Sequence, residues 1–85
     1  MLVTIIIFFT LSFYEYKDQV ISQAEASVPS KPNFEHYYDL ANAYKDSEYY
    51  EKSIKFYSLA LNKITKEHFL FPIILDRRGT SFERL

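Results

Sequence analysis

Apolar residues recur with a helical period through the middle of the chain. A first run places four of them at i, i+3, i+4 and i+7: Tyr37, Leu40, Ala41 and Tyr44. A second run follows the break at Asp46-Ser47 with the same helical spacing, and its members are Ser53, Ile54, Tyr57, Ala60, Leu61 and Ile64. Residues at this spacing share one face of an α-helix. Since two amphipathic helices with a short connection pack antiparallel, residues 34–71 are expected to form a helical hairpin.

The ends of the two helices are predicted from their flanking residues. Asn33 suits the N-cap of a first helix over residues 34–45, and Glu35 favours its first turn because acidic groups complement the helix dipole. Ser47 is expected to cap a second helix that runs from residue 48 to about residue 68.

The flanking segments extend this organisation in both directions. Pro29 and Pro32 interrupt any helix, so residues 15–33 are interpreted as a linker or as a degenerate helix of a preceding unit that ends in a proline-rich joint. The segment Phe69-Leu70-Phe71-Pro72 is expected to end the second helix of the hairpin. A further helix is then predicted from Ile73 onward, within residues 72–85.

Residues 1–14 form an uncharged apolar run, MLVTIIIFFTLSFY. The run is shorter than the roughly 20 residues that span a bilayer, and it lacks the basic start of a signal peptide. Three interpretations stay open: a signal sequence or short membrane anchor, a buried helix of a preceding unit, and a β-strand or misassigned start. The Val, Thr and Ile content supports the strand. An exported or membrane-associated location is slightly preferred over the cytoplasm.

The hairpin resembles the tetratricopeptide repeat, a helical hairpin of about 34 residues written W-x-x-L-G-x-x-Y, then A-x-x-x-F and a closing Pro. The matching positions hold Tyr37, Leu40, Ala41, Tyr44, Ser53 and Tyr57. A partial second copy holds Leu75, Arg78, Gly79, Phe82 and Leu85. The chain departs from the family at Ser47-Glu48, where the family often has Leu-Gly, and at Thr65, which replaces the closing Pro.

The resemblance implies an all-α fold in which antiparallel hairpins stack as a short α-solenoid after an apolar N-terminal segment. Large rings are then expected to pack against Ala41, Ala60 and Gly79. Gly79 lies 38 residues after Ala41, and the excess over the family period is interpreted as one extra helical turn. The expected structural residues are Tyr37, Leu40, Ala41, Tyr44, Ser53, Tyr57, Ala60, Gly79 and Phe82.

In tetratricopeptide arrays the first helix of each hairpin lines a concave groove that holds peptides. By resemblance the groove-facing residues are Tyr38, Asn42 and Lys45 in the complete unit and Asp76, Thr80 and Glu83 in the partial one. Only Asn42 agrees with members that clamp a C-terminal carboxylate, so that ligand is disfavoured. Phe82 and Leu85 lack a polar cap, so we expect a fragment of a longer array or an open end covered by another molecule, including a second copy bound end to end.

The composition offers little chemistry. The chain has 85 residues, a formal net charge of −1, no cysteine and a single glycine. The mixed charge argues against a nucleic-acid partner, and the lone glycine excludes Gly-rich phosphate loops. His36 and Asp39 share a helix face, but two ligands do not make a metal site. We therefore expect no metal, no cofactor and no catalytic residue.

Charged stretches are interpreted as solvated surface. Lysines alternate with acidic residues on the second helix, and a salt-bridged surface is expected where Arg77, Arg78 and Arg84 alternate with Asp76 and Glu83. The predicted function is a non-catalytic protein–protein interaction module or scaffold that binds a peptide or helix on its concave face. The alternative is a membrane-tethered or exported accessory or assembly protein in which residues 1–14 form the anchor.

Overall fold

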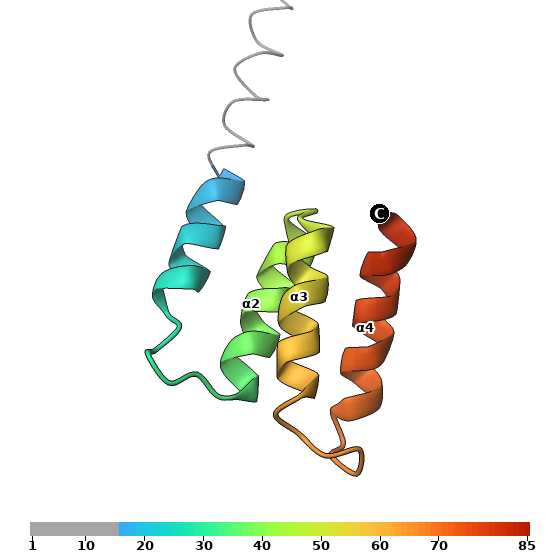
Figure 1. The fold of residues 1–85 in the computed structure, drawn as a ribbon. Coiled ribbons are helices and arrows are strands. Elements are labelled where there is room, and N and C mark those ends of the chain that lie inside the picture. Colours follow the sequence, from blue (N-terminus) through green and yellow to red (C-terminus); the bar gives the residue numbers. More distant parts are fainter. Residues whose placement is uncertain (1–15) are drawn as a thin grey trace, which may run out of the picture.

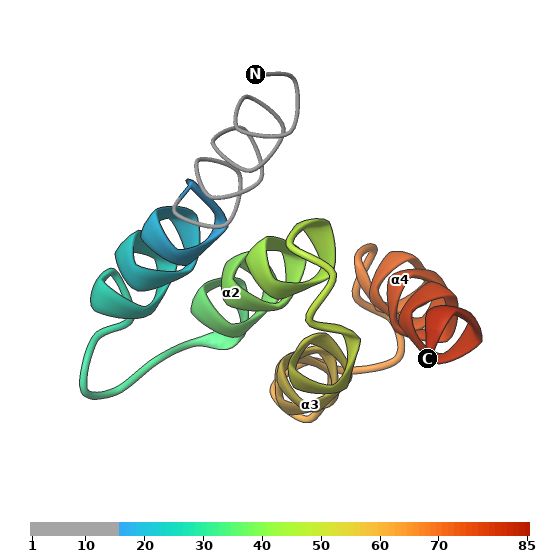
Figure 2. The ribbon, with the colours of Figure 1, turned by 90° about the horizontal axis from the view of Figure 1, so that it is seen from above.

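A row of antiparallel helices makes up the part of the chain that the structure, a computed structural model, describes, namely residues 16–85 (Figure 1). Residues 16–26 are helical, and they are followed by α2 (Phe34–Asp46), α3 (Tyr50–Leu61) and α4 (Phe71–Arg84). Seen from above, α2 and α4 flank α3, which lies out of line with them (Figure 2). No strand occurs within residues 16–85, so the predicted all-α fold is confirmed for this part.

The predictions for residues 1–14 lie outside the described residues. Within residues 16–85, no helix has both the length and the apolar character needed to cross a membrane.

The start of α2 agrees with the sequence-based prediction. Asn33 is the N-cap, and its Oδ1 accepts a hydrogen bond from the His36 backbone N–H at 3.0 Å. His36 Nδ1 in turn accepts from the Asn33 backbone N–H at 3.0 Å. This reciprocal pair is a capping box, which satisfies two donors that a helix start otherwise leaves unpaired. His36 therefore has a capping role that its interpretation as a solvated residue did not include.

The predicted limits of the second helix are wrong at both ends. Ser47 is the buried C-cap of α2 and does not cap α3, because Glu48 has a φ of 67° and this left-handed conformation separates the two helices. The helix ends at Leu61. The amount by which the spacing from Ala41 to Gly79 exceeds the tetratricopeptide period therefore lies in the non-helical connection 62–70 and not in an extra helical turn. Asn and Thr residues in that connection are poor helix formers.

Helix α4 starts earlier than predicted. It begins at Phe71, and Pro72 lies in its first turn, where a missing backbone N–H has no helical partner to lose. The expectation that residues 69–72 only terminate the preceding helix is therefore wrong.

Two apolar clusters hold the helices together. The first joins α2, α3 and α4 through Ala41, Tyr57, Ala60, Leu61 and Ile74. This cluster confirms the expected packing of rings around the two alanines.

The second cluster joins residues 16–26 to α2 through Ile21, Leu40 and Tyr44. The Phe56 ring stacks on Tyr44 with centroids 5.5 Å apart, and it packs against both clusters. Tyr37 also stacks on Phe56, at 6.1 Å. Phe56 thus links the two clusters.

Polar groups also connect α3 to α4. Ser53 and Ser81 are fully buried and their hydroxyls are hydrogen-bonded at 2.8 Å. Arg78 Nη1 donates to Ser58 Oγ at 3.1 Å. The Ser53 hydroxyl also contacts the Tyr50 carbonyl of its own helix at 2.7 Å, so both buried hydroxyls have hydrogen-bond partners, as buried polar groups usually do.

The expected packing role of Gly79 is wrong. No atom lies within 4 Å of the place that a Cβ would take at this residue, and Phe82 is 56% exposed. Leu75 and Leu85 are also exposed. No helix of residues 16–85 covers this face of α4, so rings cannot pack against Gly79. End-to-end association through this face stays a prediction.

Candidate protein-binding face

Tyr38, Asn42 and Lys45 form a row on α2. They lie at i, i+4 and i+7, so they share one side of the helix, and all three are half-buried. Arg77 of α4 contacts two of these three side chains. Its Nη1 donates to Asn42 Oδ1 at 3.1 Å, and its guanidinium carbon lies 5.7 Å from the centre of the Tyr38 ring. The row therefore faces α4, the other helix that the resemblance assigns to the groove.

Asn42 joins three helices. Its Oδ1 also accepts a hydrogen bond from the Tyr57 hydroxyl of α3, at 2.5 Å. Burial raises the pKa of Tyr57 to about 12, and the nearby Arg77 guanidinium opposes this rise. Tyr38 packs beside the Tyr57 ring, with centroids 6.2 Å apart. The side chains of Tyr38 and Asn42 are thus held in place before any ligand binds.

Sequence reasoning missed Arg77. Arg77 and Arg78 were interpreted as ion-paired surface, and that interpretation is wrong, because they bond to Asn42 and Ser58 and form no ion pair within the described residues. The spacing offers a signal in retrospect. Both arginines follow the fully buried Ile74 by one helical turn, which places them towards the interior side of α4.

The three predicted α4 residues contribute less. Asp76 and Glu83 are exposed, and neither carboxylate forms a hydrogen bond or ion pair in the described part of the chain. Thr80 is half-buried, and its hydroxyl donates to the Asp76 carbonyl within the same helix at 3.1 Å. The structure therefore brings Tyr38 and Asn42 together with Arg77, and it leaves the α4 carboxylates at the solvent boundary. We call Tyr38, Asn42, Lys45, Arg77 and Thr80 the α2–α4 face.

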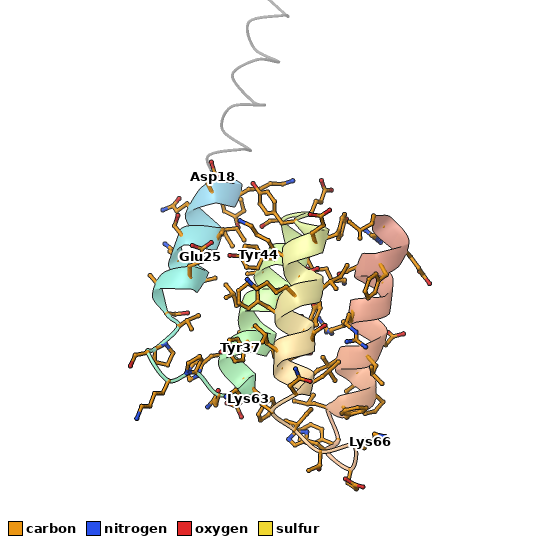
Figure 3. The ribbon with its side chains drawn as sticks, in the orientation of Figure 1. Asp18, Glu25, Tyr37, Tyr44, Lys63 and Lys66 are labelled. Carbon is orange, nitrogen blue, oxygen red and sulfur yellow. The ribbon has the colours of Figure 1, made fainter. Side chains whose placement is uncertain are left out.

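A separate set of polar contacts attaches residues 16–26 to the hairpin. The Tyr44 hydroxyl donates to Glu25 Oε1 at 2.6 Å, and Figure 3 shows the two side chains pointing toward each other. Lys17 Nζ lies 3.3 Å from Glu48 Oε2. Burial, together with the Glu25 carboxylate, raises the pKa of Tyr44 to about 12. Tyr44 therefore contacts residues 16–26, whereas Asn42 of the same helix contacts α3 and α4.

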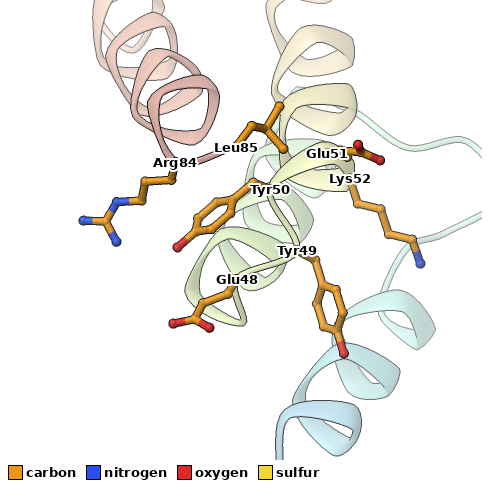
Figure 4. A pocket seen from close by; sticks show the side chains of 7 residues that line it. All are labelled: Glu48, Tyr49, Tyr50, Glu51, Lys52, Arg84 and Leu85. Carbon is orange, nitrogen blue, oxygen red and sulfur yellow. The ribbon is translucent and has the colours of Figure 1, made fainter.

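A pocket of about 370 Å³ lies where the turn between α2 and α3 meets the end of α4 (Figure 4). Its lining residues are Glu48, Tyr49, Tyr50, Glu51, Lys52, Arg84 and Leu85. The walls contain charges of both signs and two phenols, with no histidine or serine beside them. In residues 16–85 no group of three side chains could hold a metal ion.

No family model matches the chain, and no curated protein or solved structure shows a significant match to it. The resemblance to the tetratricopeptide repeat therefore stays a prediction.

Proposed function

We propose that the chain is a non-catalytic protein-interaction module whose α2–α4 face holds an extended segment or a helix of another protein. In this proposal the hairpins stack as a short solenoid of the tetratricopeptide type. The observation that carries it is the contact of Tyr38 and Asn42 of α2 with Arg77 of α4, because these two helices are not adjacent in sequence.

The chemistry of this face suits a peptide. Tyr38 offers an aromatic surface, while Asn42, Lys45 and Arg77 offer N–H donors to the carbonyl and carboxylate oxygens of a bound chain. Asn42 is already held by two hydrogen bonds. A side chain that is fixed in the free protein loses little conformational entropy on binding, and this favours affinity.

A peptide library displayed on phage tests the proposal. Peptides are selected on the wild-type chain and then measured against the variant Lys45→Ala/Thr80→Ala, which changes the α2–α4 face but leaves the Asn42 hydrogen bonds intact. The matched control is Lys55→Ala/Thr65→Ala, because it removes the same residue types from exposed positions elsewhere. We expect binding to fall about tenfold or more in the first variant, the effect of losing roughly 1.4 kcal/mol of contact energy, and to stay unchanged in the control.

Two results would count against the proposal. One is selection of peptides that bind both variants equally, which would place their site elsewhere. The other is failure to enrich any peptide while the chain remains helical by circular dichroism.

A further inference from the structure

Three lysine ammonium groups of the hairpin lie over aromatic rings. The distances from Nζ to the ring centre are 5.4, 5.5 and 6.0 Å in the pairs Lys52–Tyr44, Lys55–Phe56 and Lys63–Tyr37. The rings form one group, because Phe56 stacks on both tyrosines. In Figure 3 Tyr44, Tyr37 and Lys63 follow one another from top to bottom of the hairpin. We call the three lysines and their three rings the lysine strip.

The ammonium groups of the lysine strip are exposed, and none of them forms an ion pair within residues 16–85. Glu51 precedes Lys55 by four residues, a spacing that allows an ion pair on a helix, yet the Lys55 ammonium lies over Phe56. Lys52 and Lys55 are three residues apart, and like charges on neighbouring turns of one helix face repel each other. An anion bound between them would relieve this repulsion.

One acidic side chain, Glu25, is bonded to the lysine strip. Its Oε1 accepts the hydrogen bond of the Tyr44 hydroxyl at 2.6 Å, so this carboxylate lies at the Tyr44 end. Tyr37 precedes Tyr44 by two helical turns, which is about 10 Å along α2. Lys63, which lies over Tyr37, is therefore at the other end of the strip from the Glu25 carboxylate.

We propose that the lysine strip is a second binding surface, and that it holds a short acidic segment of another protein. Aspartate or glutamate carboxylates of this segment pair with the exposed ammonium groups. An extended chain advances about 3.3 Å per residue, so about three to four residues cover the strip. Cation–π attraction keeps each ammonium close to its ring, and a side chain that is already restrained loses less conformational entropy on binding.

The rings of the lysine strip favour a peptide over a single-stranded nucleic acid. Proteins that bind such nucleic acids offer aromatic faces on which the bases stack. Tyr44 is buried, Tyr37 and Phe56 are half-buried, and the rings stack on one another. The formal net charge of −1 also gives the chain no general attraction for a polyanion. A carboxylate needs only the ammonium groups, which are the exposed part of the strip.

Fluorescein-labelled octaglutamate tests the proposal, with binding followed by fluorescence anisotropy at low salt. The variant Lys55→Gln/Lys63→Gln removes two ammonium groups of the lysine strip. Its matched control is Lys31→Gln/Arg84→Gln, which removes two exposed positive charges that lie outside the strip. We expect the affinity for octaglutamate to fall about fivefold in the first variant, the effect of losing two exposed ion pairs, and less than about twofold in the control.

Three results would overturn the proposal, provided that circular dichroism shows the proteins to be helical. The first is the absence of octaglutamate binding to the wild type at protein concentrations up to about 1 mM. The second is an equal loss of affinity in the variant and the control, which would mean that net charge alone attracts the peptide. The third is tighter binding of a labelled oligothymidine that Lys55→Gln/Lys63→Gln weakens, which would assign the strip to nucleic acid.

The lysine strip and the α2–α4 face are tested separately. Lys45→Ala/Thr80→Ala leaves the strip intact, so we expect it to bind octaglutamate within about twofold of the wild type. A loss of about fivefold or more in this variant would place octaglutamate on the α2–α4 face and overturn the proposal. Peptides held by the α2–α4 face should in turn bind Lys55→Gln/Lys63→Gln as they bind the wild type, so either surface can fail its test without the other.

Discussion

The hydrogen bonds at Asn42 predict an asymmetric pair of substitutions. Asn42→Ala removes the acceptor of two bonds, one from the Tyr57 hydroxyl and one from Arg77. Tyr57→Phe removes only one donor and leaves Asn42 bonded to Arg77. The two variants therefore break the same bond from opposite sides with different consequences.

The magnitudes follow from burial. Tyr57 is 0% exposed, and the neighbouring Arg77 can donate a hydrogen bond to its oxygen but cannot accept one from it. Asn42→Ala therefore leaves the hydroxyl proton of Tyr57 enclosed without an acceptor, which costs about 2 kcal/mol of unfolding free energy. Tyr57→Phe costs about 1 kcal/mol, the net worth of one hydrogen bond. The double variant encloses no unpaired hydroxyl, so we expect it to cost about 1.5 kcal/mol, well below the sum of roughly 3 kcal/mol for the single variants.

Urea unfolding followed by circular dichroism measures all three variants in one double-mutant cycle. Tyr37→Phe is the matched control. Tyr37 is half-buried and its hydroxyl forms no hydrogen bond within the described residues, so we expect a change below about 0.5 kcal/mol.

Two outcomes would refute this reasoning. Additivity within about 0.5 kcal/mol would mean that the hydroxyl and the amide do not depend on each other. A cost of Tyr57→Phe equal to that of Asn42→Ala would mean that no buried donor is left unpaired when the amide is removed.

Three further predictions concern the backbone and the phenols. Gly79→Ala should raise the melting temperature, with a gain of about 0.5–1 kcal/mol, because the methyl group meets open space and alanine is the better helix former; a lower melting temperature would contradict the open face of α4. Glu48→Gly should unfold at higher urea than Glu48→Ala, by about 0.5–1 kcal/mol, since both lose the Lys17 ion pair and only glycine relieves the φ of 67°; equal midpoints would refute this strain. The pKa values of Tyr44 and Tyr57 are raised to about 12, so their neutral phenols stabilise the fold below about pH 10, and this stability is lost as the pH rises through about 12. The absorbance of tyrosinate should show one late-ionising phenol fewer in Tyr44→Phe and one fewer in Tyr57→Phe. An unchanged titration would argue against the burial of these phenols.

Helical periodicity located the interior of each helix correctly. The spacing of Tyr37, Leu40, Ala41 and Tyr44 predicted α2 to within one residue of its end, and Asn33 predicted its cap. Periodicity depends only on neighbours three or four residues away, and such neighbours are fixed once a segment is helical.

Helix ends were less predictable because other forces compete there. The second helix was predicted to begin at Glu48, yet that residue adopts a left-handed conformation and the helix begins at Tyr50. The chain must reverse its direction between α2 and α3, and Glu48 takes the left-handed conformation at this reversal. A glycine would have marked this position in the sequence, but none is present.

The candidate binding face was predictable on one helix only. The row Tyr38, Asn42 and Lys45 follows from spacing along α2, whereas Arg77 could be assigned to it only after α4 was placed beside α2. For Gly79 the spacing predicted a packing contact that the structure does not contain. Packing needs a partner surface, and the described chain supplies none at this residue.

The sequence by itself determined that residues 34–84 are largely helical and which side of α2 is apolar, because both depend on local spacing and on the preference of apolar groups for contact with one another. Only the tertiary structure decided which polar groups meet, as Asn42 meets Tyr57 and Arg77, and Ser53 meets Ser81. Hydrogen bonds need their atoms within about 3 Å, and this precision depends on how whole helices pack and not on residue order.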